Sequence, residues 1–151
     1  MITILRKHDN QYGISKMLNV QIERFGLPNV EICLLDSPTR NQAETIFQTI
    51  CQKHIDGAIY VKDADGYFES EVVRQNGVAI YPIEKLQMLN PQNKSFVNVD
   101  DLFRVTNIIE KHVVSHFINA GGYCFECASQ YCQTFKQLEK LNEKLNATFT
   151  L

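Results

Sequence analysis

Residues 30–63, VEICLLDSPTRNQAETIFQTICQKHIDGAIYVKD, decide the expected fold because they contain a strand, a helix and a second strand in succession. Residues 30–36 form a continuous apolar run, which is typical of a strand buried on both faces in a parallel sheet. A helix follows, with Ala43, Ile46 and Ile50 on one side. Residues 57–63 then form another apolar run, which is the second strand of this stretch. A crossover helix of this kind joins parallel strands.

The first half of the chain extends this pattern toward the N-terminus. Residues 2–7, ITILRK, predict a strand, and residues 9–26 carry an imperfect helical stripe that Gly26 closes at a C′ position. Thr39, followed three places later by Gln42, predicts a capping box at the start of the next helix. The order β-α-β-α-β indicates a parallel sheet with a ligand crevice at the carboxyl ends of its strands.

The second half differs, because its apolar runs are short and no long helix separates them. They predict antiparallel additions to the sheet or a β-rich flap, and occupy residues 77–86, 94–100, 102–111 and 116–126. Residues 127–146 predict a closing helix with Tyr131, Phe135, Leu138, Leu141 and Leu145 on one stripe. We therefore expect one α/β domain over residues 1–151, with a mixed, mainly parallel sheet flanked by helices.

Composition excludes several classes of protein. The formal net charge is -2 and the isoelectric point is near 6.1, which argues against a nucleic-acid surface. No apolar run approaches the ~20 residues of a membrane span, and the first residues do not form a secretory signal. The cytoplasm is the expected compartment. The five cysteines are an odd number and scattered, so they do not predict a disulfide framework.

Asp63 and Asp65 are the first candidate ligands, because they follow the apolar run of residues 57–63. Residues two apart in an extended strand share a face, so both carboxylates would reach one cation. Mg²⁺ takes one or two protein carboxylates and completes its shell with water and phosphate oxygens. The alternative is a solvated turn, since Asp65-Gly66 is also a common turn dipeptide.

Glu110 and Lys111 form a second candidate group with Gly121 and Gly122. A lysine at the end of an apolar strand can neutralise a phosphate as a point charge. Adjacent glycines permit the close approach of a ligand to the backbone. Taken singly, a Glu-Lys pair is usually surface polarity and a Gly-Gly pair is usually a bend.

Five stretches, taken in order, resemble the middle of sugar-1-phosphate nucleotidyltransferases, especially those of capsule and surface-polysaccharide gene sets. They are LLDSPTRNQAETIF (34–47), DGAIYVKDADGYF (56–68), VAIYPI (78–83), NKSFVNV (93–99) and NIIEKHVVSHFINAGGYCFE (107–126). The resemblance implies a Rossmann-like nucleotidyltransferase fold that joins a sugar 1-phosphate to a nucleoside triphosphate with Mg²⁺ and releases pyrophosphate.

The resemblance also implies roles for particular residues. Gln42 and Ala43 would lie beside the nucleobase, and Asp65, with Asp63 beside it, would hold Mg²⁺. Glu110 and Lys111 would contact the sugar and its phosphate, with Lys111 as the catalytic cation. Asn119, Gly121 and Gly122 would line the sugar pocket. In-line phosphoryl chemistry needs alignment and charge neutralisation more than a protein nucleophile, which is compatible with this set.

The chain departs from the family pattern at its N-terminal side. The family opens with a strand and a G-x-G-T-R signature, whereas none of the seven glycines here forms a G-x-G. We therefore expect a fold that is incomplete at the N-terminus and turns over nucleoside triphosphate weakly or not at all. A second family aspartate after the GGY stretch has no counterpart, and Asn41 stands where the family commonly has Gly.

Three readings follow from these observations. The chain is a weak or truncated transferase, or a non-catalytic module that binds a sugar phosphate or nucleotide sugar, or docks on an active partner. A homo-oligomer or a complementing chain is expected because a truncated sheet exposes an edge. The third reading is a zinc protein that uses His116, Cys124, Cys127 and Cys132, although such cysteines also serve as small core residues.

Overall fold

A computed structural model describes residues 1–85 and 94–148 of the chain. These residues divide into two compact units. Unit 1 combines Met1–Gly57 with the segment that begins at Cys127, and unit 2 is Ala58–Glu126. The expectation of a single domain stays a prediction, and each unit is described by itself.

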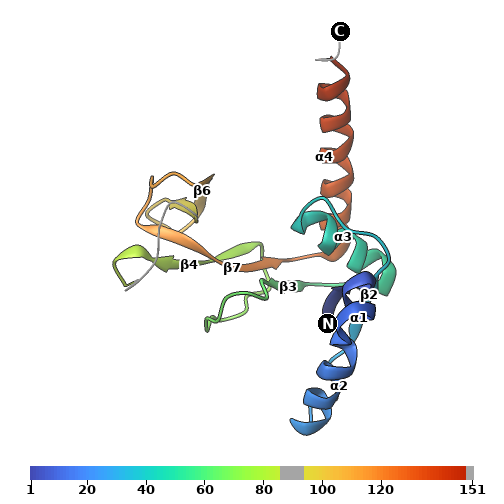
Figure 1. The fold of residues 1–151 in the computed structure, drawn as a ribbon. Helices are drawn as coiled ribbons and strands as arrows, with labels where there is room; N and C mark the ends of the chain where they lie inside the picture. Colours follow the sequence, from blue (N-terminus) through green and yellow to red (C-terminus); the bar gives the residue numbers. More distant parts are fainter. Residues whose placement is uncertain (86–93, 149–151) are drawn as a thin grey trace. The chain divides into compact units, whose positions relative to one another are not determined.

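Unit 1 holds a parallel strand pair and all four α-helices of the described chain (Figure 1). In register, Ile2 of the first strand lies opposite Ile32 and Leu5 lies opposite Leu35, in parallel, as predicted. The elements are β1 (Ile2–Leu5), α1 (Arg6–Tyr12), α2 (Ile14–Arg24), β2 (Ile32–Leu35), α3 (Gln42–Lys53) and α4 (Ala128–Thr148).

The segment between β1 and β2 differs in detail from the prediction. The strand ends at Leu5 rather than at residue 7, and the expected single helix over residues 9–26 is two helices, α1 and α2. Gly13 separates them with φ 64°, a left-handed conformation that interrupts a right-handed helix. Gly26 takes φ 59°, and the amide of Leu27 donates to Ile22 O at 3.0 Å, which confirms the predicted glycine C′ position.

Helix α3 covers the strand pair. Thr49 Oγ1 lies 3.0 Å from Thr3 Oγ1, and Gln52 Nε2 donates to the carbonyl of Leu34 at 3.1 Å. Side chains between these contacts are buried, namely Cys33, Leu35 and Ile50. Alternate residues of β2 are therefore in the core of unit 1, as the period of a strand requires.

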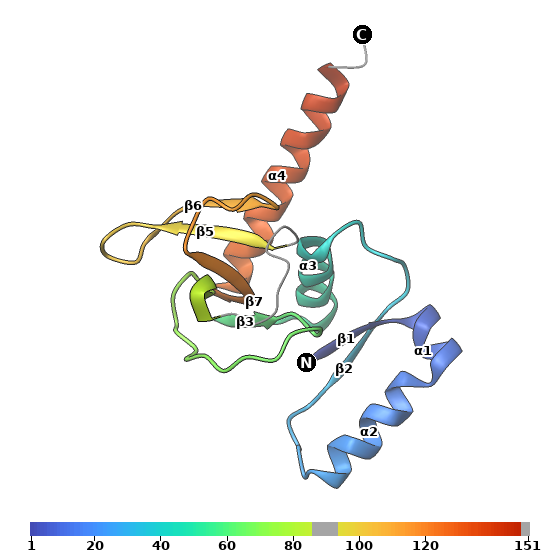
Figure 2. The same cartoon turned by 60° about the vertical axis from the view of Figure 1, so that its left-hand side comes forward.

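Helix α4 packs beside α3 and thereby joins the two chain segments of unit 1 (Figures 1 and 2). The rings of Phe47 and Phe135 stack with centroids 4.6 Å apart, and the amide of Ala128 donates to Gly57 O at 2.8 Å. Farther along α4, Leu138 and Leu141 are 54% and 53% exposed. The predicted apolar stripe is therefore only partly covered, and Leu145 lies outside the described side chains.

Unit 2 is a five-stranded antiparallel sheet, as expected for the second half of the chain (Figure 2). The prediction that β3 continues a parallel sheet is wrong, because β3 pairs with β7 in antiparallel register. The length and apolar character of β3 suit either partner, and tertiary pairing decides between them. The elements are β3 (Ile59–Lys62), β4 (Gly77–Pro82), a 3-10 turn (Ile83–Lys85), β5 (Ser95–Val99), β6 (Val105–Glu110) and β7 (Phe117–Phe125).

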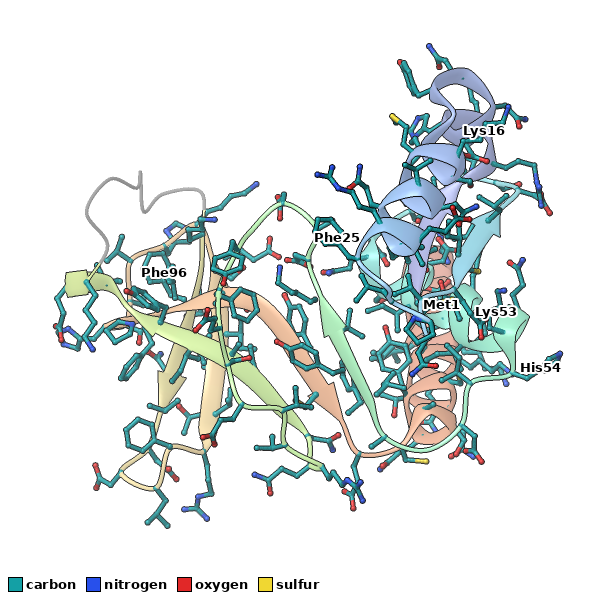
Figure 3. All side chains as sticks on the ribbon, turned by 90° about the horizontal axis from the view of Figure 1, so that it is seen from below. Met1, Lys16, Phe25, Lys53, His54 and Phe96 are labelled. Atoms are coloured by element: carbon teal, nitrogen blue, oxygen red, sulfur yellow. The ribbon has the colours of Figure 1, made fainter. Side chains whose placement is uncertain are left out.

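The buried apolar side chains of unit 2 lie on β5 and β7. Phe96, marked among these strands in Figure 3, is fully buried, as is Val97. Ile118 and Cys124 of β7 are also buried. The described chain thus combines a mixed α/β composition with one parallel and one antiparallel sheet, instead of the mainly parallel sheet expected.

Candidate functional site

Strands β3 and β5 pair with different parts of the same edge of β7, so the end of β3 and the start of β5 lie one after the other along that edge. At Tyr123, β7 has Val61 of β3 on one side and Val78 of β4 on the other. At Ile118 it pairs with Phe96 of β5 and again with β4. Since β4 keeps one side of β7, β3 and β5 share the other side. The carboxyl end of β3 therefore faces the start of β5 across residues 119–121 of β7.

The predicted site residues of unit 2 gather at this junction. Asp63 follows β3 directly, and its amide donates to Gly121 O at 2.8 Å. Glu110 ends β6 and pairs with Ser95, the first residue of β5. Lys111 comes next, with φ 61° and its amide donating to Lys94 O at 2.9 Å. Ser95 is the first residue of β5 and faces the end of β3 across residues 119–121 of β7. Glu110, at the end of β6, and Asp63, after β3, therefore lie near the same stretch of β7.

Gly121 and Gly122 are buried at the junction, and other groups occupy the space that a side chain would need. A Cβ on Gly121, which has φ 85°, would come within 2.6 Å of Asp63 Oδ2. A Cβ on Gly122 would meet the Tyr60 hydroxyl at 2.6 Å and Phe68 Cζ at 2.7 Å. Gly121 therefore allows the Asp63 carboxylate to lie directly on the backbone of β7.

Asn119 and Tyr123 form a polar link over the same glycines. Asn119 Oδ1 accepts from the amide of Gly121 at 2.9 Å, and Asn119 Nδ2 donates to the Tyr123 hydroxyl at 2.8 Å. This arrangement leaves the hydroxyl proton of Tyr123 for donation to an acceptor other than Asn119. The structure thus adds Tyr123, which is not among the predicted site residues, to the candidate site.

Burial raises the pKa of the Tyr123 hydroxyl, and the charges of Asp63 and Glu110 raise it further against the opposing hydrogen bond from Asn119. Both carboxylates therefore lie within electrostatic reach of one hydroxyl. The neutral phenol persists at neutral pH and can donate a hydrogen bond to a ligand oxygen.

The turn after β3 is held by Lys62. Its Nζ donates to Asp63 O at 2.9 Å and also contacts the carbonyl of Gly66, and it lies 4.9 Å from the centroid of the Phe68 ring. Asp63 and Asp65 do not share a strand face, contrary to the prediction, because β3 ends at Lys62 and both residues lie in this turn. Asp63 is half-buried, whereas Asp65 is exposed.

Gln42 and Ala43 lie in unit 1, where they open α3 and are exposed. The predicted Thr39–Gln42 capping box is wrong, because Asn41 is the N-cap and its Oδ1 accepts from the amide of Glu44 at 2.9 Å. Glu44 Oε2 in turn accepts from the amide of Arg40 at 2.7 Å. Asn at position 41 with Glu three places later was the sequence signal for this cap.

The sequence suggests a zinc site and a magnesium site, and the two need different sets of ligands. Within residues 1–85 and 94–148, no group of three or more His, Cys, Asp or Glu side chains is placed to hold a metal ion. This finding contradicts the zinc reading for the described residues. A Mg²⁺ site has less stringent needs, since one or two carboxylates suffice. Asp63 is half-buried and Asp65 is exposed, and their role as Mg²⁺ ligands stays a prediction.

No family model and no curated protein matches the chain. The structure is similar to the crystal structure of the nucleoside-diphosphate-sugar pyrophosphorylase from Vibrio cholerae RC9, with a TM-score of 0.69 and 18% sequence identity. The chain has a nucleotidyltransferase-like fold. The similarity covers 90% of this chain and 57% of the other, so the chain spans little more than half of that protein's length.

The fold implied by the sequence resemblance is therefore confirmed in its coarse form. The structure has mixed α/β composition and is similar to a nucleoside-diphosphate-sugar pyrophosphorylase. The roles of Gln42, Ala43, Asp63, Asp65, Glu110, Lys111, Asn119, Gly121 and Gly122 stay predictions. In the described part of the chain, no helix is long and apolar enough to cross a bilayer.

Proposed function

We propose that the chain is a sugar-1-phosphate-nucleotidyltransferase-like protein that binds a sugar phosphate or a nucleotide sugar at the junction of β3, β5 and β7. The observation that carries the proposal is the convergence of Asp63, Glu110 and the Asn119–Tyr123 pair over buried glycines. Carboxylates accept hydrogen bonds from sugar hydroxyls, and a neutral phenol donates one to a phosphate or hydroxyl oxygen. Gly121 and Gly122 leave room for the side chains of Asp63, Tyr60 and Phe68 to lie against β7.

Each group has a distinct proposed part. Glu110 accepts from sugar hydroxyls, and Lys111 neutralises the phosphate as the catalytic cation. Asp63, with Asp65 beyond it, would hold Mg²⁺, which would supply charge neutralisation for the phosphates. Gln42 and Ala43 of unit 1 are proposed, from the sequence resemblance, as the residues that contact the nucleobase. The reaction would join a sugar 1-phosphate to a nucleoside triphosphate by in-line displacement of pyrophosphate, within capsule or surface-polysaccharide synthesis.

Binding is tested by isothermal titration calorimetry with a panel of nucleotide sugars and sugar 1-phosphates, with and without Mg²⁺. Tyr123→Phe and Asp63→Asn should each weaken binding, and Asp63→Asn should also abolish its Mg²⁺ dependence. Losing a hydrogen bond to a charged ligand group corresponds to about tenfold in affinity. Asp101→Asn, an exposed change in the β5–β6 connection, is the matched control. If no member of the panel binds the parent chain, the proposal is wrong.

A non-catalytic binding module is the second candidate, because no G-x-G loop occurs among the 151 residues. A pyrophosphate-release assay with Mg²⁺ and several sugar phosphates separates the two. Binding without release supports the module. Robust release that Lys111→Met abolishes, and Lys85→Met leaves intact, supports the transferase. If the chain is a truncated transferase, adding a complementing chain that carries the glycine-rich strand should increase the rate of pyrophosphate release.

A further inference from the structure

Helices α3 and α4 come from the two separate segments of unit 1 and lie antiparallel in their side-chain contacts. Arg40, just before α3, pairs with Glu139 late in α4. Farther along α3, Phe47 stacks on Phe135 with ring centroids 4.6 Å apart. Lys136 Nζ lies 5.7 Å from the centroid of the same Phe47 ring. These contacts fix the register of the two helices.

The same register brings two thiols together. Cys51 lies four residues after Phe47, and Cys132 lies three residues before Phe135, so both are one turn along the facing stripes. The helix register and the effect of Cys51 on the pKa of the Cys132 thiol both place the two thiols near one another. Cys51 is exposed, whereas Cys132 is partly buried. Solvent reaches one member of the pair, and the helix interface shelters the other.

We propose that Cys51 and Cys132 form a dithiol–disulfide pair that hydrogen peroxide oxidises, locking α3 to α4, and that a dithiol reductant restores. The Cys51 thiolate attacks the peroxide, the O–O bond breaks, and Cys51 sulfenic acid forms with release of hydroxide. The Cys132 sulfur then attacks the sulfur of Cys51, the S–O bond breaks, and water leaves. In total, two thiols give up two electrons and hydrogen peroxide becomes two waters.

The exposure of the two thiols sets the order of these steps. Burial raises the pKa of the Cys132 thiol, and the neighbouring Cys51 raises it further, while Lys136 opposes both. Cys132 is therefore a poor first nucleophile toward an oxidant, since the thiolate is the reactive form. Cys51 is the thiol that meets the oxidant, and Cys132 resolves the product.

The bridge would have a large effect because of the chain segment it closes. All of unit 2, Ala58–Glu126, lies between the two cysteines. The bond therefore adds a direct covalent link between the two segments of unit 1, which in the described residues contact each other through packing, the Arg40–Glu139 pair and hydrogen bonds. Closing a long loop removes much of the conformational entropy of the unfolded chain.

The experiment treats the purified full chain with hydrogen peroxide, blocks remaining thiols with N-ethylmaleimide, and maps peptides by mass spectrometry without reduction. We expect one cross-linked peptide pair that joins residues 51 and 132 with loss of two hydrogen atoms. Its yield should be at least about tenfold above that in the guanidine-unfolded chain, since folding holds the thiols together. The melting temperature should rise by about 5–15 °C, and dithiothreitol should reverse the rise.

Variants make the test independent of folding defects. Cys51→Ser, a change at an exposed site, should keep the reduced melting temperature and lose the rise on oxidation. Cys127→Ser should behave like the parent chain, because Cys127 pairs with Ser129 rather than with the helix interface. A cross-link to another cysteine or to a second molecule would overturn the proposal. So would oxidation of Cys51 beyond the sulfenic acid while Cys132 stays free.

Discussion

Asp63 lies on the backbone of Gly121, with its amide donating to Gly121 O at 2.8 Å and its Oδ2 in the space of a missing side chain. This contact couples a turn after one strand to the centre of another. It also places a carboxylate beside Tyr123, whose hydroxyl is linked to the same stretch of β7 through Asn119.

Gly121→Ala should destabilise unit 2 by about 1–3 kcal/mol, because the new Cβ would face Asp63 Oδ2 at 2.6 Å in a left-handed backbone conformation. The free energy of unfolding in urea measures the effect. Gly66→Ala is the control, since a Cβ there meets nothing within 4 Å, and it should stay within about 0.5 kcal/mol. Equal effects of the two changes would refute the contact.

Asn119→Ala should cost about 1–3 kcal/mol, because it removes the acceptor of the buried Gly121 amide and the donor to Tyr123 together. The matched change is Asn107→Ala, whose side chain accepts from the amide of Ile108 at an exposed position. Denaturant unfolding should place that variant close to the parent chain. A small cost for Asn119→Ala would show that water replaces both partners.

Phe135→Ala should destabilise unit 1 by about 1–3 kcal/mol, below the ~3–5 kcal/mol typical of fully buried phenylalanine, because the stacked ring is only half-buried. Leu138→Ala, on the same helix but 54% exposed, should cost less than about 1 kcal/mol. Thermal unfolding followed by helical circular dichroism compares the two. If Leu138→Ala costs more stability than Phe135→Ala, the stacking of Phe135 on Phe47 does not stabilise unit 1.

The free energy of unfolding should decrease at alkaline pH because the hydroxyl of Tyr131 ionises. Burial raises the pKa of its hydroxyl, which donates to Ala43 O at 2.9 Å, to about 12 in the folded chain. The unfolded chain ionises near the ordinary pKa of ~10, so it loses this proton first. The contribution of Tyr131 is complete below pH ~10 and is lost as pH rises toward 12.

Unfolding free energies at pH 8 to 11.5 for the parent chain and Tyr131→Phe test this sign. The difference between the two proteins should shrink as pH rises, since the variant lacks the titrating group. A constant difference would mean that the Tyr131 hydroxyl titrates alike in both states.

Much of the local structure was readable from particular residues. Gly26 signalled the end of α2, and alternating or apolar runs signalled β4 to β7 and the long C-terminal helix. Errors arose where neighbouring signals competed. Gly13 breaks a stripe that continues on both sides of it, and Asn41 caps a helix where Thr39 and Gln42 also fit the capping pattern.

The candidate site was predictable as a set of residue types but not as an arrangement. Asp63 and Glu110 stood out as polar residues at strand ends, and Gly121 stood out as part of a glycine pair. Their meeting depends on β7 changing its neighbour from β5 to β3, and this register is absent from any one segment. Tyr123 was missed because an aromatic residue in a strand usually signals packing, and only its link to Asn119 indicates another role.

The sequence by itself determined where helices and strands form, because capping, glycine conformation and side-chain period act over a few residues. Tertiary structure alone decided the partner of β3 and the direction of that pairing. The apolar run of residues 57–63 suits a parallel or an antiparallel neighbour equally. Its partner is fixed by β7, far along the chain, whose paired glycines leave room for Asp63 and the side chains of Tyr60 and Phe68.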